Sequence, residues 1–237
     1  AVLYRDDKAI EREGYMTHLI TKEALAFIAE NRSKPFFCYI PFTSPHFPFQ
    51  TPGDRDKRFD ESNWTKGDRA SYVAMLEDLD ASVGKIVGAI DELGVAEITL
   101  ILFASDHGAM EPGRNLPFRG YKGGLFEGGI RAPLIARWPT VLPAGQRCDQ
   151  VSATFDLTAS FARIAGADIE KLQLDGADVL AIAAGGEPAR DRTLFWRARR
   201  GDRTWTAVRV GVRKVVQMHA GDAVDSWTVA LAGVPGD

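Results

Sequence analysis

The sequence lacks a long apolar run and a large charge of either sign. Its 29 Lys and Arg residues nearly balance 32 Asp and Glu residues, which leaves a formal net charge of -3. It therefore has no broad basic surface of the kind that binds nucleic acid or an anionic membrane. No apolar run approaches the roughly 20 residues that span a bilayer, and the opening residues lack the apolar core of a signal peptide. We expect neither nucleic acid nor a membrane as a partner.

Cysteine is also scarce, with 2 residues among 237. Cys38 lies inside an apolar run and Cys148 follows a predicted loop. Two cysteines in such places favour buried or free thiols over a disulfide framework. The cysteine content leaves the redox compartment undecided.

Helical and strand patterns alternate along most of the chain. Apolar residues at helical spacing and capping residues predict three helices: Thr21 to about Asn31, Asp68 to Leu93 before Gly94, and Asp156 to Ala165 before Gly166. Apolar runs predict three buried strands: Phe36 to Ile40, Ile98 to Ala104, and Ala132 to Trp138. This alternation predicts an α/β fold with a largely parallel sheet flanked by helices.

The pattern changes toward the C-terminus. Short β-type segments separated by Gly and Asp predict antiparallel strands: Thr193 to Trp196, Trp205 to Val210, Val212 to Met218, and Trp227 to Leu231. We therefore expect an α/β domain over residues 1–170, then a linker and part of an antiparallel β subdomain over residues 171–237.

Polar residues that directly follow an apolar strand are the first candidates for a site, because ligands gather at the carboxyl ends of strands in open α/β sheets. Asp106 and His107 follow the predicted strand that ends at Ala104, and Gly108 permits a sharp turn after them. A carboxylate and an imidazole side by side can ligate a metal. The Asp oxygen suits calcium, whereas the His nitrogen shifts the preference toward zinc or manganese. The alternative is that Asp106 only caps the following turn.

A second candidate is His46, which follows the predicted strand ending at Ile40. Pro45 and Pro48 flank it and restrict the backbone. An imidazole held in this way can donate a hydrogen bond to an anionic substrate or act as a general acid. The alternative is that it packs against the neighbouring aromatic residues. Residues 41–67 as a whole have the composition of a long ordered loop.

A third candidate is Lys122, which lies in a glycine-rich segment. Glycines on both sides let the backbone approach a ligand and leave the ammonium group available for a tetrahedral oxyanion. Apolar residues among the glycines favour an ordered, buried loop over a flexible one. Glu127 and Arg131 are spaced to pair across one helical turn, and we expect both to be structural.

These segments together resemble the type I sulfatases of the alkaline phosphatase superfamily. The resemblance rests on their order as well as their content, from Gly14 to Ala165. Its most specific stretch contains, in order, Ser105-Asp106-His107-Gly108, Pro117-Phe118-Arg119-Gly120, Lys122-Gly123, Glu127-Gly128-Gly129-Ile130-Arg131, Pro133 and Trp138-Pro139. It implies the alkaline-phosphatase-like fold, with the C-terminal strands as the start of the small second domain.

The resemblance also implies roles for the candidate residues. Asp106 and His107 would be metal ligands, with Ca²⁺ as the family metal. The second ligand is often Asn in sulfatases, and relatives that use Asp-His bind Mn²⁺ or Zn²⁺. Lys122 would hold the sulfate and stabilise the leaving oxygen, and His46 would contact the sulfate or assist the leaving group.

Two family features are absent from the sequence. Sulfatases make a formylglycine nucleophile from a C/S-x-P-x-R motif and bring two further acidic metal ligands from an early strand. Neither Cys38 nor Cys148 begins such a motif, and Asp6-Asp7 precedes the Gly14-Tyr15 segment too closely to be the acidic pair. We therefore expect a chain that begins mid-domain, is inactive alone, and has the missing N-terminal part of the same protein as a partner. Export is expected from the family.

The resemblance therefore implies a sulfuric ester hydrolase that acts on a sulfated small molecule or glycan. One alternative is a phosphomonoester or phosphonate hydrolase of the same superfamily. Another is a non-catalytic protein that binds sulfated glycans.

Overall fold

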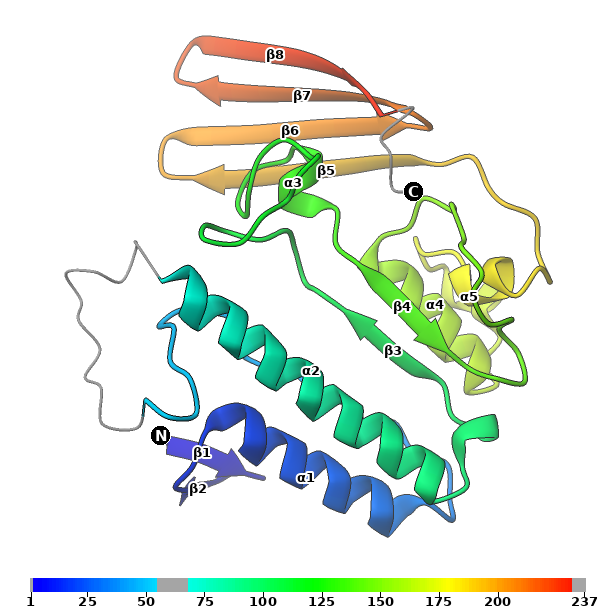
Figure 1. Ribbon diagram of the computed structural model, residues 1–237. Helices are drawn as coiled ribbons and strands as arrows, with labels where there is room; N and C mark the ends of the chain where they lie inside the picture. Colours follow the sequence, from blue (N-terminus) through cyan, green and yellow to red (C-terminus); the bar gives the residue numbers. More distant parts are fainter. Residues whose placement is uncertain (1, 55–67, 232–237) are drawn as a thin grey trace. The chain divides into compact units, whose positions relative to one another are not determined.

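The computed structural model describes residues 2–54 and 68–231, and it has a mixed α/β fold with a C-terminal antiparallel sheet (Figure 1). The chain divides into two compact units. The first comprises Ala1–Ile101 with Met110–Arg114, and the second comprises Leu102–Ala109 with Asn115–Asp237. The fold class predicted from the sequence is confirmed, whereas the domain boundary near residue 170 remains a prediction.

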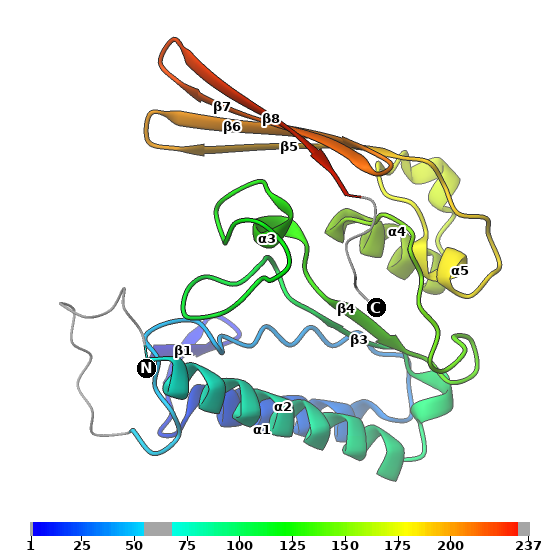
Figure 2. The same ribbon diagram turned by 45° about the horizontal axis from the view of Figure 1, so that its top comes forward.

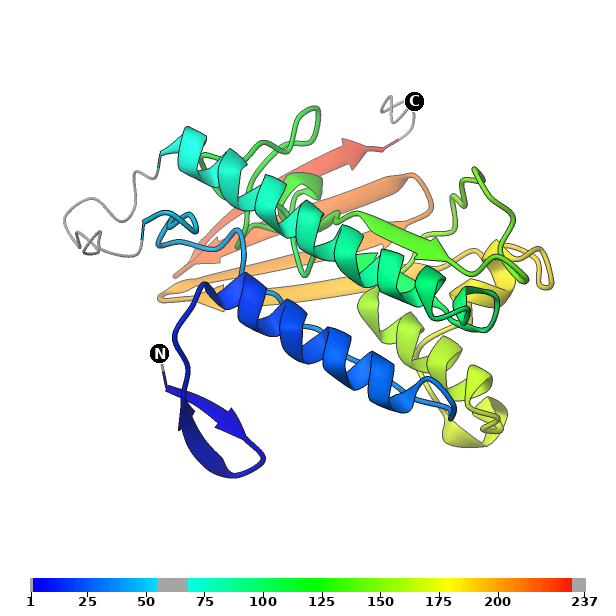
Figure 3. The same ribbon diagram turned by 60° about the horizontal axis from the view of Figure 1, so that its bottom comes forward.

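The first unit is built on two helices that run side by side in the same direction (Figures 1 and 3). They are α1, Met16–Asn31, and α2, Arg69–Glu92. A hairpin of β1, Val2–Arg5, and β2, Lys8–Glu11, precedes them. The helices meet through a buried apolar cluster of Ala24, Ile28, Ile86 and Ile90. Asp6 and Asp7 form the turn of the hairpin.

The longer helix matches its prediction closely. Asp68 is the N-cap of α2, and its carboxylate accepts a hydrogen bond from the backbone N–H of Ala70 at 2.9 Å. Gly94 follows the C-cap with a φ of +70°, a backbone conformation that favours glycine. The spacing of apolar residues and both end residues therefore determined this element locally.

The prediction that Thr21 begins the first helix was wrong. The helix begins five residues earlier, after an extended Tyr15 that makes no side-chain capping hydrogen bond. Thr21 is buried inside α1, and its hydroxyl donates to the carbonyl oxygen of Thr17 at 2.7 Å. A threonine hydroxyl can bond the carbonyl one turn earlier as readily as it caps a helix, so its presence does not mark a helix start.

The predicted buried strand at Phe36 to Ile40 was also wrong. This segment forms no strand in the described structure. Phe36 and Ile40 pack against the α1–α2 cluster, while Phe37 and Tyr39 are exposed. A strand needs a neighbour for its backbone hydrogen bonds, and the described residues place none beside this segment.

In the second unit, two short strands lie side by side. They are β3, Ile101–Ala104, and β4, Leu134–Arg137, and their arrows point in opposite directions in Figure 1. Both are shorter than predicted, because Ala96–Ile98 is a 3-10 helix and β4 starts only after Pro133. The strands are half-buried or exposed rather than fully buried as expected. In the sequence, the short helix α3, Glu127–Ile130, comes after β3 and before β4.

The helical part of the same unit is anchored by Asp156. Its carboxylate accepts from the backbone N–H groups of Ala153 and Ala177 and pairs with Arg192. Asp156 lies within α4, Thr154–Ile164, rather than at the cap position predicted for it, and Ala153 is the N-cap. Gly166 follows the helix with a φ of +83°, as predicted. The short helices Ile169–Leu172 and α5, Val179–Ala183, lie beside α4.

The C-terminal strands form a four-stranded antiparallel meander, as predicted from the sequence (Figure 2). They are β5, Thr193–Arg200; β6, Arg203–Val210; β7, Arg213–Ala220; and β8, Ala223–Ala230. Adjacent strands are joined by two-residue turns that contain Gly201, Gly211 and Gly221, all with positive φ. Such turns fix the register of each hairpin. One face of the sheet packs against Leu125 and Phe126.

Both cysteines are free thiols in the structure, in agreement with the sequence prediction. Cys38 is half-buried, and burial raises the pKa of its thiol. Cys148 is exposed. Across residues 2–54 and 68–231, no helix has both the length and the apolar character needed to cross a bilayer.

Replacing Asp68 tests the N-cap of α2. Asp68→Ala removes the acceptor for the N–H of Ala70, so we expect a loss of about 1 kcal/mol in the free energy of unfolding, measured by urea denaturation. The control is Asp80→Ala within the same helix, where Ala has the better helix propensity and stability should stay within about 0.5 kcal/mol. Equal effects of the two substitutions would contradict the capping role.

Candidate functional site

The turn after β3 carries the predicted metal ligands. The Nδ1–H of His107 donates to the carbonyl oxygen of Gly108 at 2.9 Å, which leaves Nε2 directed at the Asp106 carboxylate, 3.1 Å from Oδ2. The hydroxyl of Ser105 donates to the carbonyl oxygen of His107 at 2.9 Å and closes the turn. The Asp106 side chain is 81% exposed and that of His107 is 36% exposed. Two atoms that could ligate a metal, Nε2 of His107 and Oδ2 of Asp106, therefore face each other at the surface of this unit.

Close backbone contacts join this turn to α3. The N–H of Gly108 donates to the carbonyl oxygen of Gly129 at 3.0 Å. A β-carbon at Gly108 would lie 1.9 Å from the carbonyl oxygen of Gly128, and one at Gly128 would lie 2.2 Å from that of Gly120. No side chain fits at such distances, so glycine is required at both positions. The turn and the glycine-rich segment are packed backbone against backbone.

The glycine-rich segment places Lys122 beside the Asp106–His107 turn. The backbone N–H of Lys122 donates to the carbonyl oxygen of Ala109 at 3.1 Å. The amide of Asn115 bridges the same loops, because it bonds to both the N–H and the carbonyl oxygen of Ala109 and donates to the carbonyl oxygen of Gly120. Lys122 is half-buried. The predicted ordered loop is therefore observed.

The carboxylate of Glu127 holds the other side of this loop against the C-terminal sheet. Lys214 Nζ lies 2.8 Å from Glu127 Oε1, and Arg209 Nη1 lies 3.5 Å from Oε2. The side chains of Lys214 and Glu127 are only 1% and 7% exposed. The ammonium group also lies 5.0 Å from the centre of the Trp196 ring. The pairing of Glu127 with Arg131 predicted from the sequence was wrong.

Geometry explains that difference. The side chain of Arg131 lies over the ring of Phe118, 4.6 Å from its centre. Arg131 is the C-cap of α3 and has an extended backbone, so it does not continue the helix that carries Glu127. Burial lowers the pKa of Lys214, and its hydrogen bond to Glu127 opposes that change. Burial likewise lowers the pKa of Arg209.

His46 belongs to the first unit, in the segment between α1 and α2. Its Nδ1–H donates to the carbonyl oxygen of Phe47 at 2.7 Å, and its ring packs on that of Phe47 with centres 4.4 Å apart. The neighbouring Ser44 is held by the hydroxyl of Thr17 at 2.9 Å and that of Tyr15 at 3.4 Å. His46 is exposed. The start of α1 therefore holds the segment that carries it.

The donor set fits part of a metal site. Ca²⁺ takes about six to eight oxygen ligands, and Asp106 and His107 offer a carboxylate and one ring nitrogen. Among the residues that the structure describes, no group of three or more His, Cys, Asp or Glu side chains could hold an ion. Asp106 and His107 are therefore suited to contribute to a site that has further ligands.

The sequence prediction missed Lys214 and Arg209, which support the loop. The strand alternation offered a clue, since Lys214 shares the inward face of β7 with the buried Val216. A charged residue on the buried face of a strand needs a partner, although the sequence does not name Glu127 as that partner.

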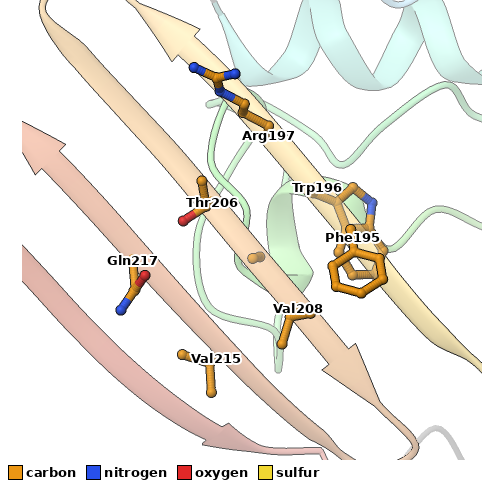
Figure 4. Close-up of a pocket in the computed structure, with 8 residues that line it drawn as sticks. Phe195, Trp196, Arg197, Thr206, Val208, Val215 and Gln217 are labelled. Carbon is orange, nitrogen blue, oxygen red and sulfur yellow. The ribbon is translucent and has the colours of Figure 1, made fainter.

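A separate hollow lies on strands β5, β6 and β7 (Figure 4). Its lining residues are Phe195, Trp196, Arg197, Thr206, Ala207, Val208, Val215 and Gln217. None of the predicted site residues borders it. We assign it no role in the candidate site.

Comparison with known proteins agrees with the motifs. The Sulfatase family model matches residues 3–167. The chain belongs to the sulfatase family. Mouse (Mus musculus) steryl-sulfatase is 33% identical over 196 residues, which are 76% of this chain and 30% of that protein. N-acetylgalactosamine-6-sulfatase from Canis lupus familiaris is 32% identical over 231 residues, or 94% of this chain and 41% of that protein. This sulfatase chain thus spans less than half the length of these curated relatives.

Solved structures show the same fold. The crystal structure of Ps i-CgsB in complex with k-i-k-neocarrahexaose has a TM-score of 0.79 and 27% identity to this sulfatase chain, and the match covers 96% of this chain and 51% of that one. Phosphonate monoester hydrolase SpPMH from Silicibacter pomeroyi has a TM-score of 0.57 at 19% identity, with 70% of this chain and 35% of that chain covered. The second match shows the fold alone.

The glycine contacts predict a strong effect of Gly128→Ala. The added β-carbon would lie 2.2 Å from a carbonyl oxygen, so we expect a loss of about 2 kcal/mol or more in thermal or urea unfolding. Gly84→Ala on α2 is the matched control. It meets nothing within 4 Å and should raise stability by about 0.5 to 1 kcal/mol. A tolerated Gly128→Ala would refute the close packing.

The Glu127–Lys214 pair also predicts non-additive effects. Lys214→Met leaves a buried carboxylate with only the longer contact to Arg209, and we expect a loss of about 3 to 5 kcal/mol in urea unfolding followed by tryptophan fluorescence. Adding Glu127→Gln removes the unpaired charge, so the double variant should be more stable than Lys214→Met alone. A loss below about 1 kcal/mol for the single variant would disprove the pair's importance.

Proposed function

We propose that the protein containing this chain hydrolyses sulfate esters. The observation that supports this most directly is the position of Lys122, whose backbone is bonded to Ala109 just after the Asp106–His107 turn. A cationic side chain and two metal-binding donors then belong to one packed group of loops. The proposed reaction, hydrolysis of a sulfate ester, comes from the chain's membership of the sulfatase family.

Each candidate residue has a proposed role. Asp106 and His107 contribute two ligands to the metal ion that the family uses. The Lys122 ammonium group binds the sulfate and neutralises charge that develops on the ester oxygen. His46 contacts the sulfate or supplies a proton to the leaving group through Nε2–H of its protonated ring, because Nδ1–H is hydrogen-bonded to the carbonyl oxygen of Phe47.

The metal ion and the formylglycine nucleophile are proposed because the sulfatase family uses them. The metal, when bound, withdraws charge from the sulfate oxygens, and formylglycine supplies the nucleophile. We propose Ca²⁺ as the metal, with Mn²⁺ or Zn²⁺ as alternatives because His107 supplies a nitrogen donor. We also propose that the protein is exported, as sulfatases generally are.

The substrate class is a sulfated small molecule or glycan. Steryl and N-acetylgalactosamine-6-sulfatases are among the relatives. The structure of BT4656 was solved with D-glucosamine-2-N,6-O-disulfate, and that of Ps i-CgsB with k-i-k-neocarrahexaose. The sugars bound in these two structures favour a sulfated glycan as the substrate class, whereas the curated relatives include a steryl-sulfatase as well as an N-acetylgalactosamine-6-sulfatase.

The nitrogen donor of His107 favours a second candidate function, hydrolysis of a phosphomonoester or phosphonate with a transition metal. The two functions are separated by turnover of aryl sulfate and aryl phosphate by the purified natural gene product that contains this chain. Faster turnover of the sulfate, lost on chelation and restored by Ca²⁺, supports the sulfatase proposal. Faster turnover of the phosphate, restored by Mn²⁺ or Zn²⁺, supports the alternative.

Lys122→Ala tests the role of the ammonium group in the same protein. Removal of one group that stabilises a developing negative charge should lower kcat about 100- to 1000-fold. Lys171→Ala is the control, because Lys171 is an exposed lysine paired with Asp168 at 2.9 Å and should leave kcat unchanged. Equal kcat for Lys122→Ala and the unmodified protein would overturn the assignment. If the unmodified protein binds a sulfated sugar but does not turn it over, it would instead be a non-catalytic glycan-binding protein.

A further inference from the structure

The hairpin between β5 and β6 brings a second cation to the Lys122 loop. A β-carbon at Gly123 would lie 3.9 Å from Nη1 of Arg200, so the guanidinium group approaches the backbone of the residue next to Lys122. Gly123 has a φ of +89° and is exposed. Arg200 is the last residue of β5 and is also exposed.

The fold fixes which way Arg200 points. Side chains alternate between the two faces of a strand, so Arg200 shares a face with Trp196 and Ala198. Those two residues pack against the cluster that contains Phe126, which lies four residues after Lys122 on the same loop. Arg199, by contrast, projects from the opposite face of the same strand.

The loop and the sheet are also held together firmly. Phe126 lies 5.5 Å from Trp227 and 6.3 Å from Trp205 between ring centres, and Arg119 lies over the ring of Phe126 at 4.1 Å. The buried Glu127–Lys214 pair adds a second connection. The approach of Arg200 to the loop is therefore part of a packed arrangement rather than an encounter of two loose surfaces.

The charges around this contact call for an anion. No carboxylate pairs with the Arg200 guanidinium among residues 2–54 and 68–231. The segment 119–124 contains Arg119 and Lys122 without any acidic residue. A sulfate monoester carries a single negative charge, and Lys122 supplies one positive charge for it, whereas the Arg119 guanidinium lies over the rings of Phe126 and Trp227. Arg200 therefore adds a cation that a singly charged substrate leaves uncompensated.

We propose that Arg200 is a specificity-determining residue that binds a second anionic group of the substrate, a sulfate or carboxylate near the sulfate that is cleaved. The substrate class is then a glycan with at least two anionic groups. This inference rests on the proposed function, because it takes Lys122 as the residue that binds the reacting sulfate. Guanidinium groups suit sulfate and carboxylate through paired N–H donors.

The test uses the natural gene product that contains this chain and two oligosaccharides that differ only in carrying one or two sulfates. Arg200→Ala should lower kcat/KM for the disulfated sugar about 10- to 100-fold, the effect of losing one charge-assisted hydrogen bond, and leave the monosulfated sugar unchanged. Arg200→Lys should restore part of the loss. Arg199→Ala removes the same charge from the other face and should change neither substrate.

Two results would overturn the inference. An equal loss on both sugars would mean that Arg200 acts on the reacting sulfate or supports the loop, and no loss on either would mean that it binds no substrate. If the unmodified protein turns over no sulfate ester, the proposed hydrolase function fails instead. The affinities of the two sugars, measured by calorimetry, then decide the inference. It requires that the unmodified protein bind the disulfated sugar more tightly than the monosulfated one, and that Arg200→Ala abolish this difference.

Discussion

The buried ion pair between Glu127 and Lys214 fixes how the glycine-rich loop packs against the C-terminal sheet in the second unit of this sulfatase chain. A buried carboxylate and a buried ammonium group are costly apart, so each requires the other. Their bond joins residues 87 positions apart and ties a one-turn helix to the third strand of the C-terminal sheet. The glycine-rich loop that carries Lys122 is thereby attached to the sheet. A second attachment is made by Phe126, whose ring meets the stacked rings of Trp205 and Trp227 edge-on.

The glycines complete this arrangement on the other side of the loop. Gly108, Gly128 and Gly129 allow backbone to lie directly on backbone, where any side chain would collide with a carbonyl oxygen. As a result, backbone hydrogen bonds hold the segment of Lys122 directly beside the Asp106–His107 turn. In the role proposed for Lys122, this fixed backbone would reduce the freedom that the residue loses when it binds a tetrahedral anion. Arg200 extends the same positive region from the sheet.

Local sequence predicted the elements whose determinants are local. The α2 helix has its apolar spacing, its Asp68 cap and its Gly94 stop within one continuous segment, and the β5–β8 meander has a glycine in each turn. Elements that depend on distant partners were predicted less well. The segment from Phe36 to Ile40 has the composition of a buried strand, but strand formation depends on a neighbour. Thr21 has the character of a cap, but it bonds within its own helix.

The sequence by itself determined the family, through ordered motifs, and the residues with which a sulfatase site would be built. Asp106, His107, Lys122 and His46 were all named from their positions after apolar runs or between glycines, although their roles remain proposals. Only the tertiary structure decided that Glu127 pairs with Lys214 instead of Arg131, and that Arg200 approaches the Lys122 loop. The physical reason is that sequence spacing limits which side chains can meet within one helix or strand, whereas contacts between distant segments depend on how the sheet and loops pack.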